Sequence, residues 1–175
     1  MVRKLALFLG VSAVVLLFAS RPAQAQDRGE VYAGYSYMRF NPGNGTDGNN
    51  LNGFDISGQY KFAPWIGAVA DFGGEYGTVA GVSGSSVNTF LFGPQVSFPA
   101  RVSPFAHVLI GAGHFDFGHG GPSDTAFASA LGFGFDARLR HGVAWRVVQA
   151  DWVHTSFFGD GQNNARISTG IVLRF

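Results

Sequence analysis

The chain has 175 residues, of which 46% are hydrophobic and 15% aromatic, but only 13% are charged, and its formal net charge is +1. This composition excludes a disordered chain, which is rich in charged and poor in apolar residues, and it argues against a nucleic-acid binder, which needs clustered Lys and Arg. The sequence contains no Cys, which excludes a disulfide scaffold and a cysteine-ligated metal site. The 26 Gly and 18 Phe leave two classes, an unusual all-β globule or a membrane barrel.

The first 25 residues have the pattern of a secretory signal peptide. Two basic residues precede an apolar stretch over 5–18, and Ala23-Gln24-Ala25 supplies a small-x-small cleavage site. The apolar stretch is shorter than the about 20 residues that a transmembrane helix needs. We therefore expect export through a cleaved signal peptide, residues 1–25, followed by one domain over 26–175. Three basic residues and no acidic residue leave with the signal, so the net charge of the remaining chain is −2.

After residue 26, apolar residues alternate with polar or small ones, and no window shows an apolar face at helical spacing. Clusters of Gly, Asn, Asp, Ser and Pro separate the alternating stretches, each of which has roughly the 9–11 residues that a tilted strand needs to cross a bilayer. The sequence predicts an all-β fold, an eight-stranded antiparallel up-and-down transmembrane β-barrel. Its strands are expected at 30–40, 51–62, 65–76, 87–98, 103–115, 125–137, 143–154 and 165–175.

The connections between these strands alternate in length, as they do in outer-membrane barrels. Short turns are expected at 63–64, 99–102 and 138–142, and longer polar loops at 41–50, 77–86, 116–124 and 155–164. With both termini in the periplasm, the four longer loops would face outside the cell. These loops are Gly-rich and carry few of the aromatic residues that anchor partners, apart from Phe157-Phe158.

The two faces of the predicted strands differ in side-chain size. In 125–137, for example, one face carries Phe133 and Phe135, whereas the other carries Gly and Ala residues followed by Asp136. Side chains just fill the interior of an eight-stranded barrel, so rows of large rings are expected to face outward into lipid. A closed barrel also leaves no unpaired backbone edge in the membrane. The alternative, a soluble lipocalin-like barrel, requires the apolar rows to point inward.

The inward rows carry charges of both signs. Because an isolated buried ion costs several kcal/mol, we expect these charges to pair in a packed lumen and not to form a catalytic site. Alternation breaks at Val147-Val148, and a β-bulge there would turn Arg146, Gln149 and Asp151 inward together. The predicted lumen network comprises Asp55, Asp71, Glu75, Asp136, Arg146, Asp151, Arg166 and Arg174.

Three segments, GEVYAGYSYMRF at 29–40, VVQADW at 147–152 and STGIVLRF at 168–175, resemble the small outer-membrane β-barrel superfamily. This group includes the membrane domain of outer-membrane protein A and the opacity-type adhesins. The resemblance covers 27–175 and implies a location in the cell outer membrane, contact with its lipid, and a structural or surface-interaction role. It also implies that the barrel-assembly machinery reads alternate residues of the last strand, namely Ile167, Thr169, Ile171, Leu173 and Phe175.

One motif raises the possibility of catalysis. His154-Thr155-Ser156 resembles the His-x-Ser of outer-membrane lipid A deacylases, and residues two apart in a strand share a face. That family usually has Asn where this chain has Phe157, and the predicted last strand offers no carboxylate for a triad, which leaves only Asp160 in the loop nearby. We therefore expect a non-enzymatic protein, with lipid A deacylase and a narrow porin-like channel as alternatives.

No cofactor or metal is expected. His114, Asp116 and His119 are unevenly spaced in one Gly-rich loop, so ordering them around a cation would cost considerable entropy. The segment 44–48 has Asn/Gly turn chemistry and lacks the bidentate Glu of a calcium loop. The expected partners are membrane lipid and the assembly machinery but no nucleic acid, and the sequence names no extracellular ligand.

Overall fold

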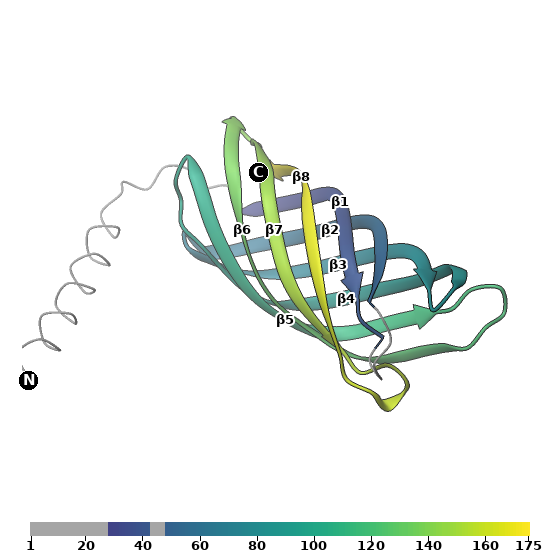
Figure 1. The fold of residues 1–175 in the computed structure, drawn as a ribbon. Coiled ribbons are helices and arrows are strands. Elements are labelled where there is room, and N and C mark those ends of the chain that lie inside the picture. Colours follow the sequence, from purple (N-terminus) through teal and green to yellow (C-terminus); the bar gives the residue numbers. More distant parts are fainter. Residues whose placement is uncertain (1–27, 43–47) are drawn as a thin grey trace, which may run out of the picture.

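The computed structural model describes residues 28–42 and 48–175; the predicted signal peptide and part of the first loop lie outside the described residues. Eight antiparallel strands form one closed barrel in which each strand pairs with its neighbours in sequence and the last pairs with the first (Figure 1). The eight-stranded up-and-down barrel is therefore confirmed. The strands are β1 Gly29–Phe40, β2 Asn49–Ala63, β3 Ile66–Val79, β4 Val82–Ser97, β5 Val102–Asp116, β6 Ser123–Arg140, β7 Val143–Thr155 and β8 Gln162–Arg174.

The two ends of the barrel carry different connections. The turn end holds the short β2–β3, β4–β5 and β6–β7 connections, and there Gly29 and Phe175 exchange two backbone hydrogen bonds of 2.8 and 2.9 Å. The loop end holds the other four connections, including the single turn of 3₁₀ helix η1 Phe157–Gly159. In the ranges that the structure describes, no helix is long and apolar enough to cross a membrane.

The prediction of a long loop at 77–86 is wrong. β3 and β4 continue through this segment to a two-residue turn, Ala80-Gly81, and Val79 and Val87 are buried. Both turn residues have positive φ, 50° and 82°, as in the type I′ turns whose twist matches that of the flanking strands. The Ser- and Gly-rich composition resembles a loop, but β3 and β4 stay paired up to Val79 and Val82, so the hairpin extends beyond its expected length.

A β-bulge interrupts β7 where it was predicted. The register of β7 against β6 and against β8 shifts between Arg146 and Gln149, and Val147 is the extra residue. The shift leaves both Arg146 and Gln149 buried in the lumen, whereas Val147 is exposed on the outer wall. Strict alternation would have put one of the two polar side chains on the lipid-facing wall.

The outer wall of the barrel is apolar. Most of its largest exposed side chains are aromatic or aliphatic, which excludes the soluble lipocalin-like alternative because the apolar rows point outward. These residues lie along the whole wall and include Phe62, Trp65, Phe90, Phe92, Val108, Phe127, Leu131, Phe133, Trp152, Ile167 and Leu173.

The interior is divided into two halves along its length. Toward the turn end it is polar, as expected, but toward the loop end it is filled by a core of buried apolar side chains. Assigning Phe to the lipid face was therefore wrong for Phe40 and Phe115, whose rings stack in this core. Phe157, which was expected in a loop, packs against Phe115 there. These rings close the lumen at the loop end, where a polar interior would admit water. The apolar core comprises Met38, Phe40, Leu51, Val69, Val79, Val87, Leu91, Leu109, Phe115, Ala128, Ala130, Val153 and Phe157.

Candidate functional site

Arg166 lies in the middle of the lumen and is fully buried. Its Nη2 atom lies 2.9 Å from Asp151 Oδ2, 3.0 Å from Asp71 Oδ1 and 4.0 Å from Asp55 Oδ2. One guanidinium group from β8 thus faces carboxylates from β7, β3 and β2. Since the three carboxylates outnumber the guanidinium, their remaining oxygens need neutral hydrogen-bond donors.

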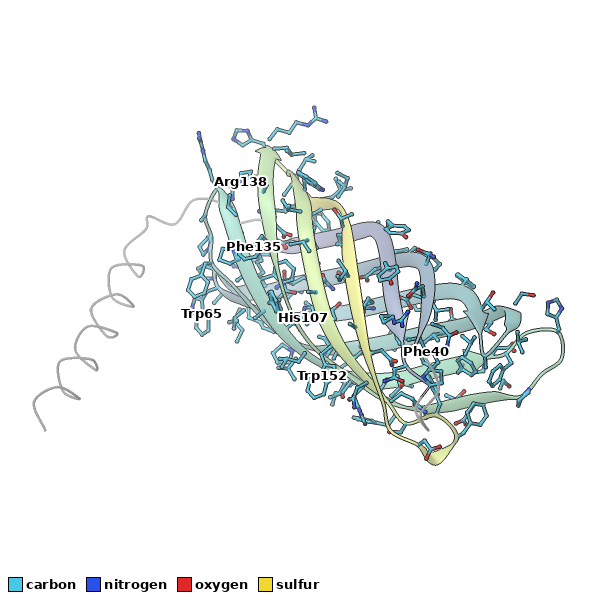
Figure 2. The ribbon with its side chains drawn as sticks, in the orientation of Figure 1. Phe40, Trp65, His107, Phe135, Arg138 and Trp152 are labelled. Carbon is cyan, nitrogen blue, oxygen red and sulfur yellow. The ribbon has the colours of Figure 1, made fainter. Side chains whose placement is uncertain are left out.

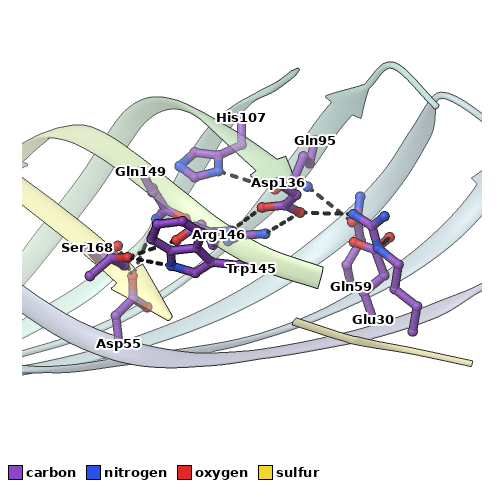
Figure 3. A network of polar contacts seen from close by, with 12 residues as sticks. Glu30, Asp55, Gln59, Gln95, His107, Asp136, Trp145, Arg146, Gln149 and Ser168 are labelled. Carbon is purple, nitrogen blue, oxygen red and sulfur yellow. Dashed lines mark hydrogen bonds and ion pairs between the residues drawn. The ribbon is translucent and has the colours of Figure 1, made fainter. Parts of the chain in front are cut away.

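Neutral side chains supply these donors (Figure 3). Gln149 donates through Nε2 to Asp151 Oδ2 at 2.8 Å and to Asp55 Oδ2 at 3.4 Å, and the Ser168 hydroxyl donates to Asp55 Oδ2 at 3.1 Å. His107 Nε2 lies 2.8 Å from Asp151 Oδ1, and its Nδ1 lies 3.4 Å from Gln95 Oε1. The β7 bulge makes this arrangement possible, because it places Gln149 beside both carboxylates.

A second charged group lies nearer the turn end. Arg146 donates from Nε to Asp136 Oδ1 at 2.9 Å and from Nη1 to Gln149 Oε1 at 2.7 Å, so the two groups are connected. Its guanidinium also lies between the rings of Tyr32 and Phe105, 4.3 and 4.2 Å from their centroids. Such cation–π contacts stabilise a charge away from water.

Arg174 extends this group to the edge of the barrel. Its Nη2 donates to Asp136 Oδ2 at 3.0 Å, and its Nε lies 2.9 Å from Glu30 Oε1. Lys61 Nζ also contacts Glu30 Oε1. The ion pairs therefore run from the middle of the lumen to the turn end.

The structure brings seven of the eight residues of the predicted lumen network into these two connected groups. Glu75 is also buried in the lumen, but its Oε1 accepts a hydrogen bond of 2.8 Å from the Ser36 hydroxyl, and no ion pair joins it to another described residue. Sequence reasoning missed Glu30 and Gln95. Their inward positions in the alternation of β1 and β4 were the signal that could have found them.

In the described part of the chain, no hydrogen bond joins His154 to Ser156 of the His-x-Ser motif. His154 lies near the end of β7, where its Nδ1 is 3.1 Å from Asn163 Oδ1 on β8. Thr155 between them is buried and hydrogen-bonds to Gln162, and Ser156 precedes the η1 turn. Nδ1, the imidazole nitrogen that would face the carboxylate in a triad, is thus engaged by a neutral amide on the neighbouring strand.

The third loop does not gather its polar residues around one point. His114 Nδ1 lies 2.8 Å from Thr125 Oγ1, whereas Asp116 Oδ1 accepts the Gly118 backbone N–H at 2.6 Å. Across residues 28–42 and 48–175, no group of three or more His, Asp or Glu side chains is placed to hold a metal ion.

Aromatic rings gather at the loop end. This loop-end aromatic cluster comprises Phe40, Phe115, Phe117, Phe157 and Phe158. Phe157 is buried and covers the lumen, whereas Phe158 is 51% exposed. Phe158 has a φ of 54°, which is uncommon outside glycine, and its backbone N–H donates to Asp124 Oδ2 at 2.5 Å. Packing and this hydrogen bond thus hold the Phe158 backbone in a strained conformation that leaves its ring exposed.

The alternate residues of β8 line the outer wall. Ile167, Ile171, Leu173 and Phe175 are exposed, and Thr169 accepts a hydrogen bond of 3.1 Å from Trp145 Nε1. They form one continuous row beside the junction of β8 with β1, which is the seam where the barrel closes.

An apolar outer wall, a closed ladder of eight strands and an ion-paired interior together define a transmembrane β-barrel. The chain belongs to the family of the outer membrane protein beta-barrel domain, whose sequence profile matches residues 11–175. It is therefore an outer-membrane β-barrel. No curated protein sequence gives a significant match.

Solved structures with a similar fold are small outer-membrane barrels. Ail, the attachment invasion locus protein of Yersinia pestis, matches with a TM-score of 0.60 and 20% identity over 84% of this chain and 97% of its own. Neisserial surface protein A matches with a TM-score of 0.63 and 12% identity over 87% of this chain and 100% of its own. The N-terminal barrel of Pseudomonas aeruginosa OprF has a TM-score of 0.51 and 11% identity, over 86% and 99% of the two chains. At these identities the similarity shows the fold alone.

Proposed function

We propose that this outer-membrane barrel has a non-enzymatic role and binds a macromolecular partner outside the cell through its loop end. The proposal places the loop end on the outer face of the membrane. Two of the similar structures carry names that refer to attachment and to the cell surface, which supports a surface role for this architecture.

The proposal rests on Phe158, whose aromatic side chain is exposed and whose backbone has a positive φ. An exposed aromatic side chain is a frequent anchor in protein interfaces, since it offers a large contact area with few rotatable bonds. Here the ring packs against Phe115 and Phe117, and its strained backbone is fixed by Asp124. Backbone strain that packing maintains at an exposed position is typical of a binding site.

The charges at the loop end indicate the chemistry of the partner. Among described residues there, Asp160 is exposed and Asp116 and Asp124 are half-buried. Arg39 is the exposed arginine, and its guanidinium is hydrogen-bonded to Asn50; His114 and His119 are also exposed. An acidic rim around an aromatic anchor suits a protein with apolar and basic groups. It does not suit a sulfated polysaccharide, although Ail has been crystallised with the heparin analogue sucrose octasulfate.

The test compares cells that produce the wild-type barrel with cells that produce Phe158→Ser, on surfaces coated with fibronectin, laminin, collagen or heparin. We expect wild-type cells to adhere to at least one of the protein coats and not to heparin, and Phe158→Ser to lower that adhesion about ten-fold or more. Phe62→Ser, which alters an even more exposed ring at the turn end, should leave adhesion unchanged. Wild-type cells that adhere no better than cells lacking the barrel, or a Phe158→Ser variant that adheres normally, would contradict the proposal.

The packed lumen argues against the channel alternative. Apolar side chains fill the loop-end half, and paired charges fill the half nearer the turn end. We expect a flat current trace for the purified barrel in a planar bilayer, and stable unitary conductance steps would instead favour a channel. Likewise, lipid A that keeps all its acyl chains in cells producing the barrel, as measured by mass spectrometry, would agree with a non-enzymatic role.

We also propose that the barrel-assembly machinery recognises the outward row of β8 that ends at Phe175. The support is its position, since this row lies on the closing seam and its apolar side chains are exposed.

A further inference from the structure

Exposed charges are distributed unevenly between the two ends of the barrel. At the turn end, Arg101 in the β4–β5 connection and Arg138 and Arg140 at the end of β6 are exposed. The described carboxylates nearest to them, Glu30 and Asp136, are buried and paired with the cations of the lumen network. The turn end therefore presents positive charge with no exposed Asp or Glu side chain among the described residues to neutralise it.

The three arginines lie close together on adjoining elements. The Arg138 backbone N–H donates to the Arg101 carbonyl oxygen at 2.9 Å, which places these two residues side by side. Arg140 follows two positions later on β6, at the tight turn into β7, and His141 in that turn is also exposed. Figure 2 shows Arg138 close to the turn end of this hairpin. Within the described ranges none of the three guanidinium groups forms an ion pair.

This arginine cluster directly adjoins the apolar wall. Leu139, between two of the arginines in sequence, is 60% exposed, and Val102 and Trp145 beside them are exposed on the same wall. A Trp at the end of an apolar membrane band marks the level of the lipid headgroups. The guanidinium groups thus lie next to the plane of the lipid phosphates, which planar guanidinium groups bind through two parallel hydrogen bonds.

We propose that Arg101, Arg138 and Arg140 form a binding site for the phosphate groups of anionic phospholipids in the leaflet around the turn end. With the loop end outside the cell, this is the periplasmic leaflet. Each cationic side chain held at an anionic membrane surface adds to the electrostatic attraction, and three adjacent arginines concentrate that attraction at the turn end. The site fixes how deeply the β5–β7 wall sits in the membrane. The apolar residues of the wall contact the acyl chains of the leaflet, and the arginines contact the adjoining phosphate groups.

The test measures lipid retention by native mass spectrometry. The wild-type barrel, purified in a nonionic detergent, is mixed with equal amounts of phosphatidylglycerol and phosphatidylcholine that carry identical acyl chains. We expect about ten-fold more bound phosphatidylglycerol than phosphatidylcholine for the wild type, and an equal ratio for the Arg101→Gln/Arg138→Gln/Arg140→Gln variant. The control, Arg39→Gln at the loop end, should keep the preference. A triple variant that keeps it, or a wild type without it, overturns the proposal.

A second measurement distinguishes lipid from cell-wall polymer as the anionic partner. Wild type and triple variant are placed in nanodiscs of phosphatidylcholine alone and sedimented with purified peptidoglycan sacculi. We expect neither protein to pellet with the sacculi beyond empty nanodiscs. Co-sedimentation of the wild type that the triple variant loses would assign the cluster to peptidoglycan and overturn the lipid assignment. Because heat-modifiable gel migration reports the closed barrel, it verifies that both proteins are folded in each experiment.

Discussion

Asp151 on β7 and Arg166 on β8 lie directly opposite each other, and both Nε and Nη2 of the arginine approach the same carboxylate oxygen at 2.9 Å. Both side chains are buried. A slip of one residue between these strands would turn one of the two charges out to lipid. The pair therefore specifies the register of the strands as well as neutralising charge.

Replacing Arg166 with Met should lower the free energy of unfolding by about 3–5 kcal/mol, because removing one partner leaves Asp55, Asp71 and Asp151 buried without a countercharge. Urea titration of the barrel in lipid vesicles, followed by tryptophan fluorescence, measures the difference. The control is Arg39→Met, an exposed position at the loop end, which should stay within about 0.5 kcal/mol of the wild type. Equal effects of the two substitutions would refute the central role of Arg166.

Gly132→Ala should destabilise the barrel by about 1–3 kcal/mol, since a Cβ at that position would overlap Asp151 Oδ1 and His107 Nε2 and force the pair apart. Gly58 is the matched control, because nothing lies within 4 Å of a Cβ built there. Unfolding in urea again gives the stability. The nitrogen chemical shifts of the His107 ring should change in Gly132→Ala and not in Gly58→Ala. If both alanines are tolerated equally, the lumen is looser than these contacts require.

The turn between β3 and β4 offers a test of backbone strain. Ala80 has a φ of 50°, and Asn is the residue type preferred before Gly in such a turn. We expect Ala80→Asn to raise the unfolding free energy by up to about 1 kcal/mol and Ala80→Val to lower it by about 1 kcal/mol or more. The two variants change the same exposed site in opposite directions, so differential scanning calorimetry should show midpoints on either side of the wild type. A lower midpoint for Ala80→Asn would speak against the two-residue turn.

Phe175→Ser should reduce the amount of barrel in the outer membrane of cells several-fold, while the purified, refolded protein keeps its stability within about 0.5 kcal/mol. The ring is 71% exposed, so it contributes little to packing, and the loss is expected in recognition by the assembly machinery. Phe62→Ser removes a ring that is 70% exposed at the end of β2, and it should insert normally. Immunoblotting of membrane fractions gives the amounts; equal losses for the two variants would mean that position 175 has no special role.

Much of this architecture was predictable, because lipid imposes a simple rule on every strand. Side chains on one face must be apolar, so alternation alone located eight strands, and its interruption at Val147-Val148 located the bulge. The inward polar residues could be identified for the same reason. Which of them meet was not predictable, since Asp71 and Arg166 are 95 positions apart and their contact depends on the closure of the barrel.

Two features could not be deduced from a residue-type pattern. Small residues in the 77–86 segment have the composition of a loop, and only the pairing of β3 with β4 shows that they form a hairpin. The apolar half of the lumen was missed because a ring that faces lipid and a ring that faces the lumen have the same chemistry. Phe115 and Phe90 differ in the neighbours they meet, not in type.

The contact between Arg166 and Asp71 crosses the lumen from the last strand to the third. It can therefore form only when the whole chain has been synthesised and its sheet has curled round. Until then the carboxylates of β2 and β3 have no guanidinium to neutralise them. A partial sheet that entered the bilayer would therefore carry unpaired charged side chains. The same pair that stabilises the finished barrel thus penalises premature insertion, and it favours delivery of the chain to the membrane as a single cooperative unit.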